Sequence, residues 1–188
     1  MSTKSLDVFE SIDRLNNGKI LIHPTEGVWG LGCDATSIDA VAKIFKLKNR
    51  VESKSLVVLV SSIKMLCSYV HKVPQKAIDI ITTTKKPTTI IYNNPKGLAA
   101  NAIASDNTIA IRIPSHDYCL EPINKFGKPI ISTSANISGE STPKSFSEIS
   151  LPILEGVDYV VNLEQDKITD KSSTILKIVG NDIEVIRA

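Results

Sequence analysis

Cysteine and aromatic residues are scarce in this sequence of 188 residues, which has three Cys, four Phe, four Tyr and one Trp. Cys33, Cys67 and Cys119 are isolated from one another, so they offer neither the paired spacing of a zinc site nor an even-numbered disulfide framework. Long apolar runs are missing too, since no stretch reaches the roughly 18 residues of a membrane span and the N-terminus is polar and charged. We therefore expect a soluble protein of the reducing cytoplasm without membrane contact.

The common catalytic motifs are also absent. The sequence has no GxxxxGK[ST] phosphate loop, no GxSxG nucleophile elbow and no HExxH zinc motif. His23, His71 and His116 are scattered, and an isolated histidine is more often a structural residue than a ligand. We expect neither a catalytic triad nor a metal ion held by protein side chains alone.

Composition and charge are those of an ordinary globular domain. Hydrophobic residues make up 42% and charged residues 22%, and the net charge is +2 with a pI near 8.4. So small a charge does not indicate a nucleic-acid or membrane protein, and any basic binding surface must be local. No repeat or linker divides the chain, so we expect one domain over residues 1–188 with no appended C-terminal domain.

Strand and helix patterns alternate along the chain. Short apolar runs predict strands at 19–22, 55–60, 88–92, 108–113, 129–132, 159–162, 173–179 and 183–186. Helical spacing predicts helices at 8–15, 38–48, 62–70, 74–83 and 118–126. Thr36 and Asp39 resemble a capping box for the second helix, whereas residues 23–34 are predicted to form a loop. The alternation predicts an α/β fold whose sheet has an antiparallel portion near the C-terminus.

Three polar stretches stand above this background, and the first is KIFKLKNRVESK at 43–54. One interpretation is a solvated helix end, where the helix dipole favours cations. Residues two apart do not share a helix face, so Lys48 and Arg50 can meet at one ligand only if the helix ends near Leu47. An ammonium group beside a planar guanidinium is suited to phosphate or pyrophosphate.

The second stretch, HPTEGVWGLGCD, has glycines that allow the backbone to approach a ligand, with Thr25 and Glu26 as polar groups. A tight structural loop with Trp29 in the core explains the same residues equally well.

The third stretch, STSANISG at 132–139, follows a predicted strand, and open α/β sheets bind ligands beyond the carboxyl ends of their strands. Ser132, Thr133, Ser134 and Asn136 would then present short polar groups to phosphate oxygens. The alternative is a turn that its own Ser and Asn side chains satisfy.

In this order and at these separations, HPTEGVWGLGCD, KLKNR and STSANISG resemble the motifs of the YrdC-like threonylcarbamoyl-AMP synthase family. The resemblance runs from about Leu15 to Ala188 and includes TIAIRIP and KSSTILKI. It implies a twisted open mixed sheet flanked by helices, with a concave basic surface. It also implies an enzyme that joins L-threonine, bicarbonate and ATP into threonylcarbamoyladenylate and releases pyrophosphate. Partner proteins then transfer the threonylcarbamoyl group to the adenosine next to the anticodon of tRNA.

The resemblance also implies the site residues. The family's KxR motif falls on Lys48 and Arg50, and its SxN motif falls on Ser134 and Asn136, which are the four expected catalytic residues. The residues expected to bind ATP and threonine are Thr25, Arg112, Ser132, Lys54 and Ser173. The sequence departs from many relatives at Gly27, Val51, Lys54 and Leu59, which bears on amino-acid recognition.

Adenylate formation of this kind needs alignment of two anions and stabilisation of phosphate charge, but no protein nucleophile. We expect Lys48 and Arg50 to neutralise the phosphates, Ser134 and Asn136 to position them, and Arg112 to lie near the amino-acid carboxylate. Mg²⁺ is expected to arrive with ATP, bound chiefly by phosphate oxygens.

Two other functions fit parts of the sequence. One is an RNA-binding or ribosome-maturation module that uses the same basic cleft, with at least weak affinity for RNA or tRNA. Few aromatic residues support it, and none lies among the lysines of 43–54. The other is the related domain of hydrogenase-maturation carbamoyltransferases, which lies within a longer chain with zinc-binding CxxC motifs that are absent from this sequence.

Overall fold

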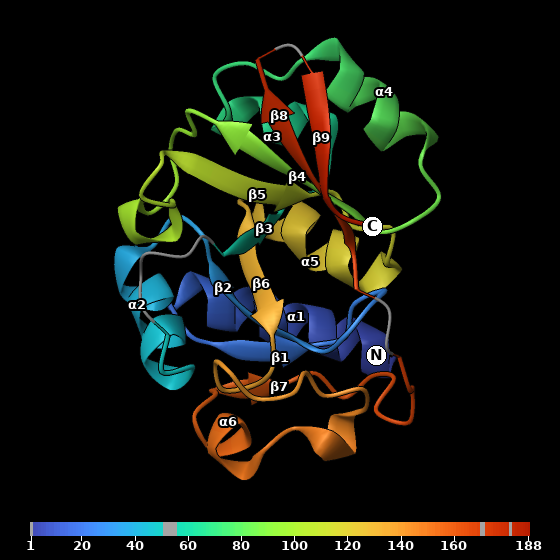
Figure 1. Ribbon diagram of the computed structural model, residues 1–188. Helices are drawn as coiled ribbons and strands as arrows, with labels where there is room; N and C mark the ends of the chain where they lie inside the picture. Colours follow the sequence, from blue (N-terminus) through green and yellow to red (C-terminus); the bar gives the residue numbers. More distant parts are fainter. Residues whose placement is uncertain (1, 51–55, 170–171, 181) are drawn as a thin grey trace.

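The computed structural model describes residues 2–50, 56–169, 172–180 and 182–188. The strands of this part of the chain form one sheet in the order β7-β1-β2-β6-β3-β5-β4-β8-β9 (Figure 1). Their bounds are β1 Leu21–His23, β2 Gly30–Asp34, β3 Val57–Leu59, β4 Thr88–Asn93, β5 Thr108–Arg112, β6 Ile130–Ser134, β7 Tyr159–Val160, β8 Thr174–Val179 and β9 Asp182–Arg187. The α-helices are α1 Thr3–Asn16, α2 Ile38–Leu47, α3 Ile63–Tyr69, α4 Gln75–Thr83, α5 Asp117–Phe126 and α6 Leu151–Glu155, with short 3₁₀ turns at Ala100–Ala102 and Phe146–Glu148.

The sheet is mixed and open. Strands β1 and β7, β3 and β5, and β4 and β8 pair in parallel, whereas the other neighbours pair antiparallel. Strands β7 and β9 form its two ends. The predicted α/β class is therefore confirmed, and so is the hairpin at the C-terminus, which β8 and β9 make around Gly180 in the left-handed region at φ 62°.

Side-chain alternation divides the sheet into two different faces. Val58, Ile111, Ile90 and Leu176 point to one face and join the main core, to which α2, α3 and α4 contribute apolar residues. On the other face, Leu59 and Ile130 pack against α1 and α5 in a second, smaller core. The second core covers only the part of this face near β1, β6 and the end of β3. This core leaves the rest of the face uncovered, which spans β4, β5 and β8 and includes nearby residues of β2, β3 and β6.

Strand β2 corrects the prediction that residues 23–34 form a loop throughout. Its glycines disfavour a strand locally, yet β2 pairs with β1 on one side and with β6 on the other. A Cβ atom at Gly30 would lie 2.7 Å from Ser132 Oγ and 3.0 Å from His23 Nε2. Glycine therefore lets three strands bring His23 and Ser132 close together, a tertiary requirement that the local pattern does not reveal.

The beginning of one helix and the cap of another also differ from the predictions. Helix α1 begins at Thr3 rather than near Val8, because the Ser2 side chain caps it by accepting a hydrogen bond from Ser5 N. Helix α2 is capped by Ser37, which accepts from Ala40 N at 3.3 Å, so Thr36 is not the cap residue. Thr36 instead donates from Oγ1 to the Asp34 carboxylate at 2.6 Å. In the described part of the chain, no helix combines the length and apolar character needed to cross a membrane.

The cap of α2 gives a stability prediction. Ser37→Ala removes the side-chain acceptor and should lower the free energy of unfolding by about 1 kcal/mol, whereas Ser37→Gly should cost only a few tenths. Urea unfolding of the two variants and the wild type measures the difference. Equal losses for alanine and glycine would show that Ser37 does not act as the cap.

Candidate active site

A cavity of about 420 Å³ lies on the uncovered part of the sheet. It is a suitable size for a small-molecule ligand. The arginines that line it are Arg50, Arg112 and Arg187. The polar uncharged residues that line it are Thr25, Thr89, Ser132, Thr133, Ser134, Thr142, Ser172 and Ser173. Since the described lining contains no carboxylate, the cavity is suited to anions.

Arg50 reaches the cavity because α2 ends in a Schellman motif. Asn49 takes the left-handed conformation at φ 49°, and its N–H donates to Lys46 O at 3.2 Å, while Arg50 N donates to Phe45 O at 3.0 Å. Asparagine tolerates this conformation better than most residues. The helix ends at Leu47, one residue before the predicted end, and a left-handed turn at Asn49 rather than a simple extended segment separates Arg50 from Lys48.

Lys48 is not among the residues that line the cavity, and the residue is only 1% exposed. Its Nζ donates to Ser134 O, to Asn136 O at 2.6 Å and, more weakly, to Asn136 Oδ1 at 3.3 Å. Its own carbonyl accepts from Ser138 N at 2.8 Å. Burial, and next the nearby Arg50 guanidinium, lower the pKa of Lys48 from 10.5 to about 8. Lys48 thus fastens the end of α2 to the loop after β6.

The two members of the SxN motif also lie differently. Ser134 lines the cavity, whereas the Asn136 side chain is buried. The Asn136 amide donates from Nδ2 to Glu140 O at 2.8 Å and accepts from Lys48 through Oδ1, so it holds the turn of its own loop. Of the four expected catalytic residues, Arg50 and Ser134 therefore line the cavity, whereas Lys48 and Asn136 are buried and do not belong to its lining.

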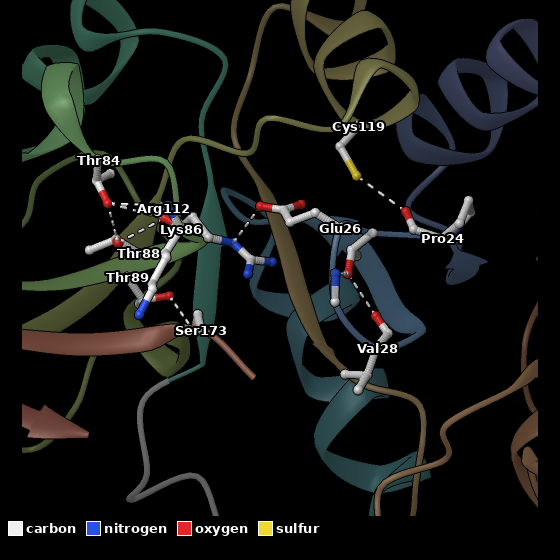
Figure 2. A network of polar contacts seen from close by, with 12 residues as sticks. Pro24, Glu26, Val28, Thr84, Lys86, Thr88, Thr89, Arg112, Cys119 and Ser173 are labelled. Atoms are coloured by element: carbon white, nitrogen blue, oxygen red, sulfur yellow. Dashed lines mark hydrogen bonds and ion pairs between the residues drawn. The ribbon is translucent and has the colours of Figure 1, made fainter. Parts of the chain in front are cut away.

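The loop between β1 and β2 forms another wall. Thr25 lines the cavity, and its hydroxyl accepts from Gly27 N at 3.0 Å and donates to Val28 O at 2.7 Å. On the other side of Pro24, the Cys119 thiol donates to the Pro24 carbonyl at 3.2 Å (Figure 2). The Thr25 hydroxyl therefore holds the loop internally, and the Cys119 thiol attaches its first residue to α5.

Glu26 extends from the same loop toward Arg112 at the end of β5, and Figure 2 shows the carboxylate facing the guanidinium. Arg112 Nε lies 3.7 Å from Glu26 Oε1, and the two side chains are only 10% and 12% exposed. Arg112 Nε and Glu26 Oε2 are buried and make no hydrogen bond within the described residues. The ion pair is loose, and both partners keep capacity for a further polar ligand.

Arg187 is a cavity residue that the sequence analysis missed. Its guanidinium donates to Ser173 O from Nε at 3.1 Å and from Nη2 at 2.8 Å, and Ser173 Oγ accepts from Thr89 Oγ1 at 3.0 Å. Arg187 is the last residue of a strand predicted to end at Ile186, so only the hairpin that returns it beside β8 reveals its place.

The structure brings most of the predicted residues together. Those that line the cavity are Thr25, Arg50, Arg112, Ser132, Ser134 and Ser173. Lys54 lies outside the described residues. Within the described ranges, no group of three or more His, Cys, Asp or Glu side chains is arranged to hold a metal ion.

Comparison with known proteins places the chain in a family. The Sua5/YciO/YrdC family model, described as "Telomere recombination", matches residues 13–188, so the chain belongs to this family. The threonylcarbamoyl-AMP synthase of Hahella chejuensis is 33% identical over 151 residues, which cover 80% of this chain and 82% of that protein. The protein of the same name from Pseudoalteromonas translucida is 33% identical over 159 residues, which cover 81% and 83%.

Solved structures agree on the fold. The crystal structure of P. abyssi Sua5 complexed with L-threonine matches with a TM-score of 0.88 at 24% identity. The match covers 98% of this chain and 54% of that chain, so the present chain spans about half the length of that relative. The predicted family and its open mixed sheet are thereby confirmed.

The position of Lys48 gives a pH-dependent prediction. Lys48→Met leaves oxygens of the loop without their donor and should cost about 2–4 kcal/mol of unfolding free energy at pH 7. The pKa of Lys48 is about 8 in the folded protein and 10.5 for an ordinary lysine. Between these two pH values, the Lys48 side chain therefore carries its proton more often in the unfolded than in the folded protein. The stability contribution of Lys48 therefore rises with pH across that interval, and the variant lacks this rise.

Urea unfolding of wild type and Lys48→Met at pH 7 and pH 10 tests this. The stability difference between the two proteins should be larger at pH 10. A difference that stays the same at both pH values would contradict the burial of a titrating ammonium group.

Proposed function

We propose that this protein is a threonylcarbamoyl-AMP synthase, which forms L-threonylcarbamoyladenylate and pyrophosphate from L-threonine, bicarbonate and ATP. The observation that carries the proposal is the cavity with three arginines, many hydroxyl groups and no carboxylate in its described lining. Such a cavity is complementary to a triphosphate and a carboxylate bound side by side. The curated relatives that share a third of their residues with this chain bear the name of this enzyme.

Each cavity arginine has a proposed role. Arg50 and Arg187 bind ATP phosphates, and Arg112 binds the carboxylate of threonine. The planar guanidinium group of Arg112 can donate two parallel hydrogen bonds to the planar carboxylate. Ser132 and Ser134 project from β6 into the same cavity and donate hydrogen bonds to phosphate oxygens. Thr25 and Ser173 complete opposite walls, and Lys54 remains a proposed phosphate contact on sequence grounds.

Lys48 and Asn136 act from outside the cavity lining. The hydrogen bonds of Lys48 with Ser134 O and with Asn136 fix the loop that follows Ser134, and we assign both residues this positioning role in place of direct phosphate binding. Both remain essential in this proposal, because a loop that moves by about 1 Å loses alignment of the reacting groups.

The arrangement fits a reaction without a protein nucleophile. A carboxylate oxygen of N-carboxy-threonine attacks the α-phosphorus of ATP, the bond to the β-phosphate oxygen breaks, and pyrophosphate leaves with the bond electrons. Fixed guanidinium groups stabilise the charge that develops on phosphate oxygens. Mg²⁺ enters as part of the ATP substrate and is held by phosphate oxygens. Separate proteins of the cytoplasm then transfer the threonylcarbamoyl group to tRNA.

Pyrophosphate release from ATP by the purified protein tests the function. Release should require both L-threonine and bicarbonate and should be greater with threonine than with serine or valine. Arg50→Ala should lower kcat/KM by roughly 30- to 1000-fold, or about 2–4 kcal/mol, because it removes charge stabilisation at the phosphates.

Arg14→Ala is the matched control, because Arg14 lies on α1 and pairs with Glu10 at 2.9 Å, outside the cavity lining. This variant should keep wild-type activity. Folded wild-type protein without threonine-dependent release, but with salt-sensitive RNA binding, would instead support the RNA-binding module.

A further inference from the structure

The proposed reaction requires a proton acceptor. The α-amino group of threonine is protonated at neutral pH and cannot attack a carbonyl carbon until it loses a proton. General-base groups in proteins are chiefly His, Asp, Glu, Lys, Tyr and Cys side chains. None of these residue types occurs in the described lining of the cavity.

Glu26 is a carboxylate next to residues that line this cavity, although it is not itself in the described lining. It lies between Thr25 and Gly27, which both line the cavity, and its Oε1 is 3.7 Å from Nε of Arg112, another lining residue. Its Oε2 is buried and accepts no hydrogen bond within the described part of the chain. A buried carboxylate oxygen without a donor is costly, so a ligand that donates a hydrogen bond there is favoured.

Arg112 and Glu26 together match the two ends of an α-amino acid. The guanidinium is complementary to the α-carboxylate, and the carboxylate is complementary to the α-ammonium group. The looseness of the ion pair in Figure 2 suits this use, since two groups in tight bidentate contact would have satisfied each other.

Other titratable groups around Glu26 leave this assignment intact. The groups of neighbouring elements that interact with Glu26 are Arg112 of β5 and the Cys119 thiol of α5, and Cys119 in turn interacts with Glu164 and Lys167 of the segment after β7. His23 of β1 interacts with the same Arg112 and with His116. Burial lowers the pKa of His23 to about 4, and burial followed by the Glu26 carboxylate raises the pKa of the Cys119 thiol. Both are neutral near pH 7. Glu164 and Lys167 pair with each other at 2.9 Å.

We propose that Glu26 binds the α-ammonium group of the amino-acid substrate and accepts the proton that this group must lose before its nitrogen attacks bicarbonate. In this step the N–C bond forms and the bond from carbon to one bicarbonate oxygen breaks. One ammonium proton leaves with that oxygen as water, a second passes to Glu26, and the third stays on the nitrogen of N-carboxy-threonine. Glu26 is thus a catalytic residue of the first half-reaction, and this inference rests on the proposed function.

The test compares Glu26→Gln with wild type in threonine- and bicarbonate-dependent pyrophosphate release between pH 6.5 and about pH 9. At pH 7 the variant should lose about 100-fold in kcat, as expected for a missing general base, and its KM for threonine should rise several-fold. Its activity should then recover by up to about tenfold per pH unit relative to wild type, because free amine becomes more abundant without help from the enzyme. A role confined to holding Arg112 gives no such recovery.

Glu155→Gln, an exposed glutamate of α6, is the matched control and should behave as wild type. Thermal unfolding establishes that Glu26→Gln is folded, and Glu26→Asp, which keeps the carboxylate, should retain more activity at pH 7 than the glutamine variant. Equal activity of Glu26→Gln and wild type, or a loss that is the same at every pH, would overturn the role of Glu26 alone. Wild-type protein without threonine-dependent release would overturn the proposed function and this inference with it.

Discussion

An ammonium group removed from water must find its hydrogen-bond acceptors inside the protein, and for Lys48 these are oxygens of Ser134 and Asn136. This contact joins two segments that lie 86 residues apart in sequence. The end of α2 and the loop after β6 therefore hold each other in place, and Arg50 and Ser134 project into the cavity from the two sides of this junction. The direction of Arg50 depends further on the left-handed turn at Asn49.

The unequal covering of the sheet explains why the cavity lies where it does. Strands β1 to β6 and β8 send apolar side chains into the main core, to which α2, α3 and α4 also contribute. Alternate residues of the same strands, such as Thr89, Arg112 and Ser132, point to the opposite face and line the cavity. Packing on one face thereby sets the positions of polar groups on the other.

The sequence contains enough information to predict the fold class, most helices and part of the set of residues that meet in the cavity. The apolar runs and the three ordered motifs carry this information. It does not reveal β2, because the glycines that disfavour a strand locally are required by contacts with His23 and Ser132 on neighbouring strands. Nor does the two-residue spacing in KxR and SxN show that one residue of each pair faces the cavity while the other is buried. That difference arises from the turn at Asn49 and from tertiary hydrogen bonds.

The choice of cation at each position follows from the same geometry. Guanidinium groups keep their charge at any physiological pH, so Arg50 remains positive although burial lowers its pKa, and its planar fork suits oxyanions in an open cavity. The ammonium group of Lys48 is compact, and its three donors can be directed to Ser134 O, Asn136 O and Asn136 Oδ1, which do not lie in the fixed fork geometry that suits a guanidinium. The two basic residues of KxR are therefore not interchangeable. One is suited to a ligand that enters and leaves, and the other to a protein segment that must stay in place.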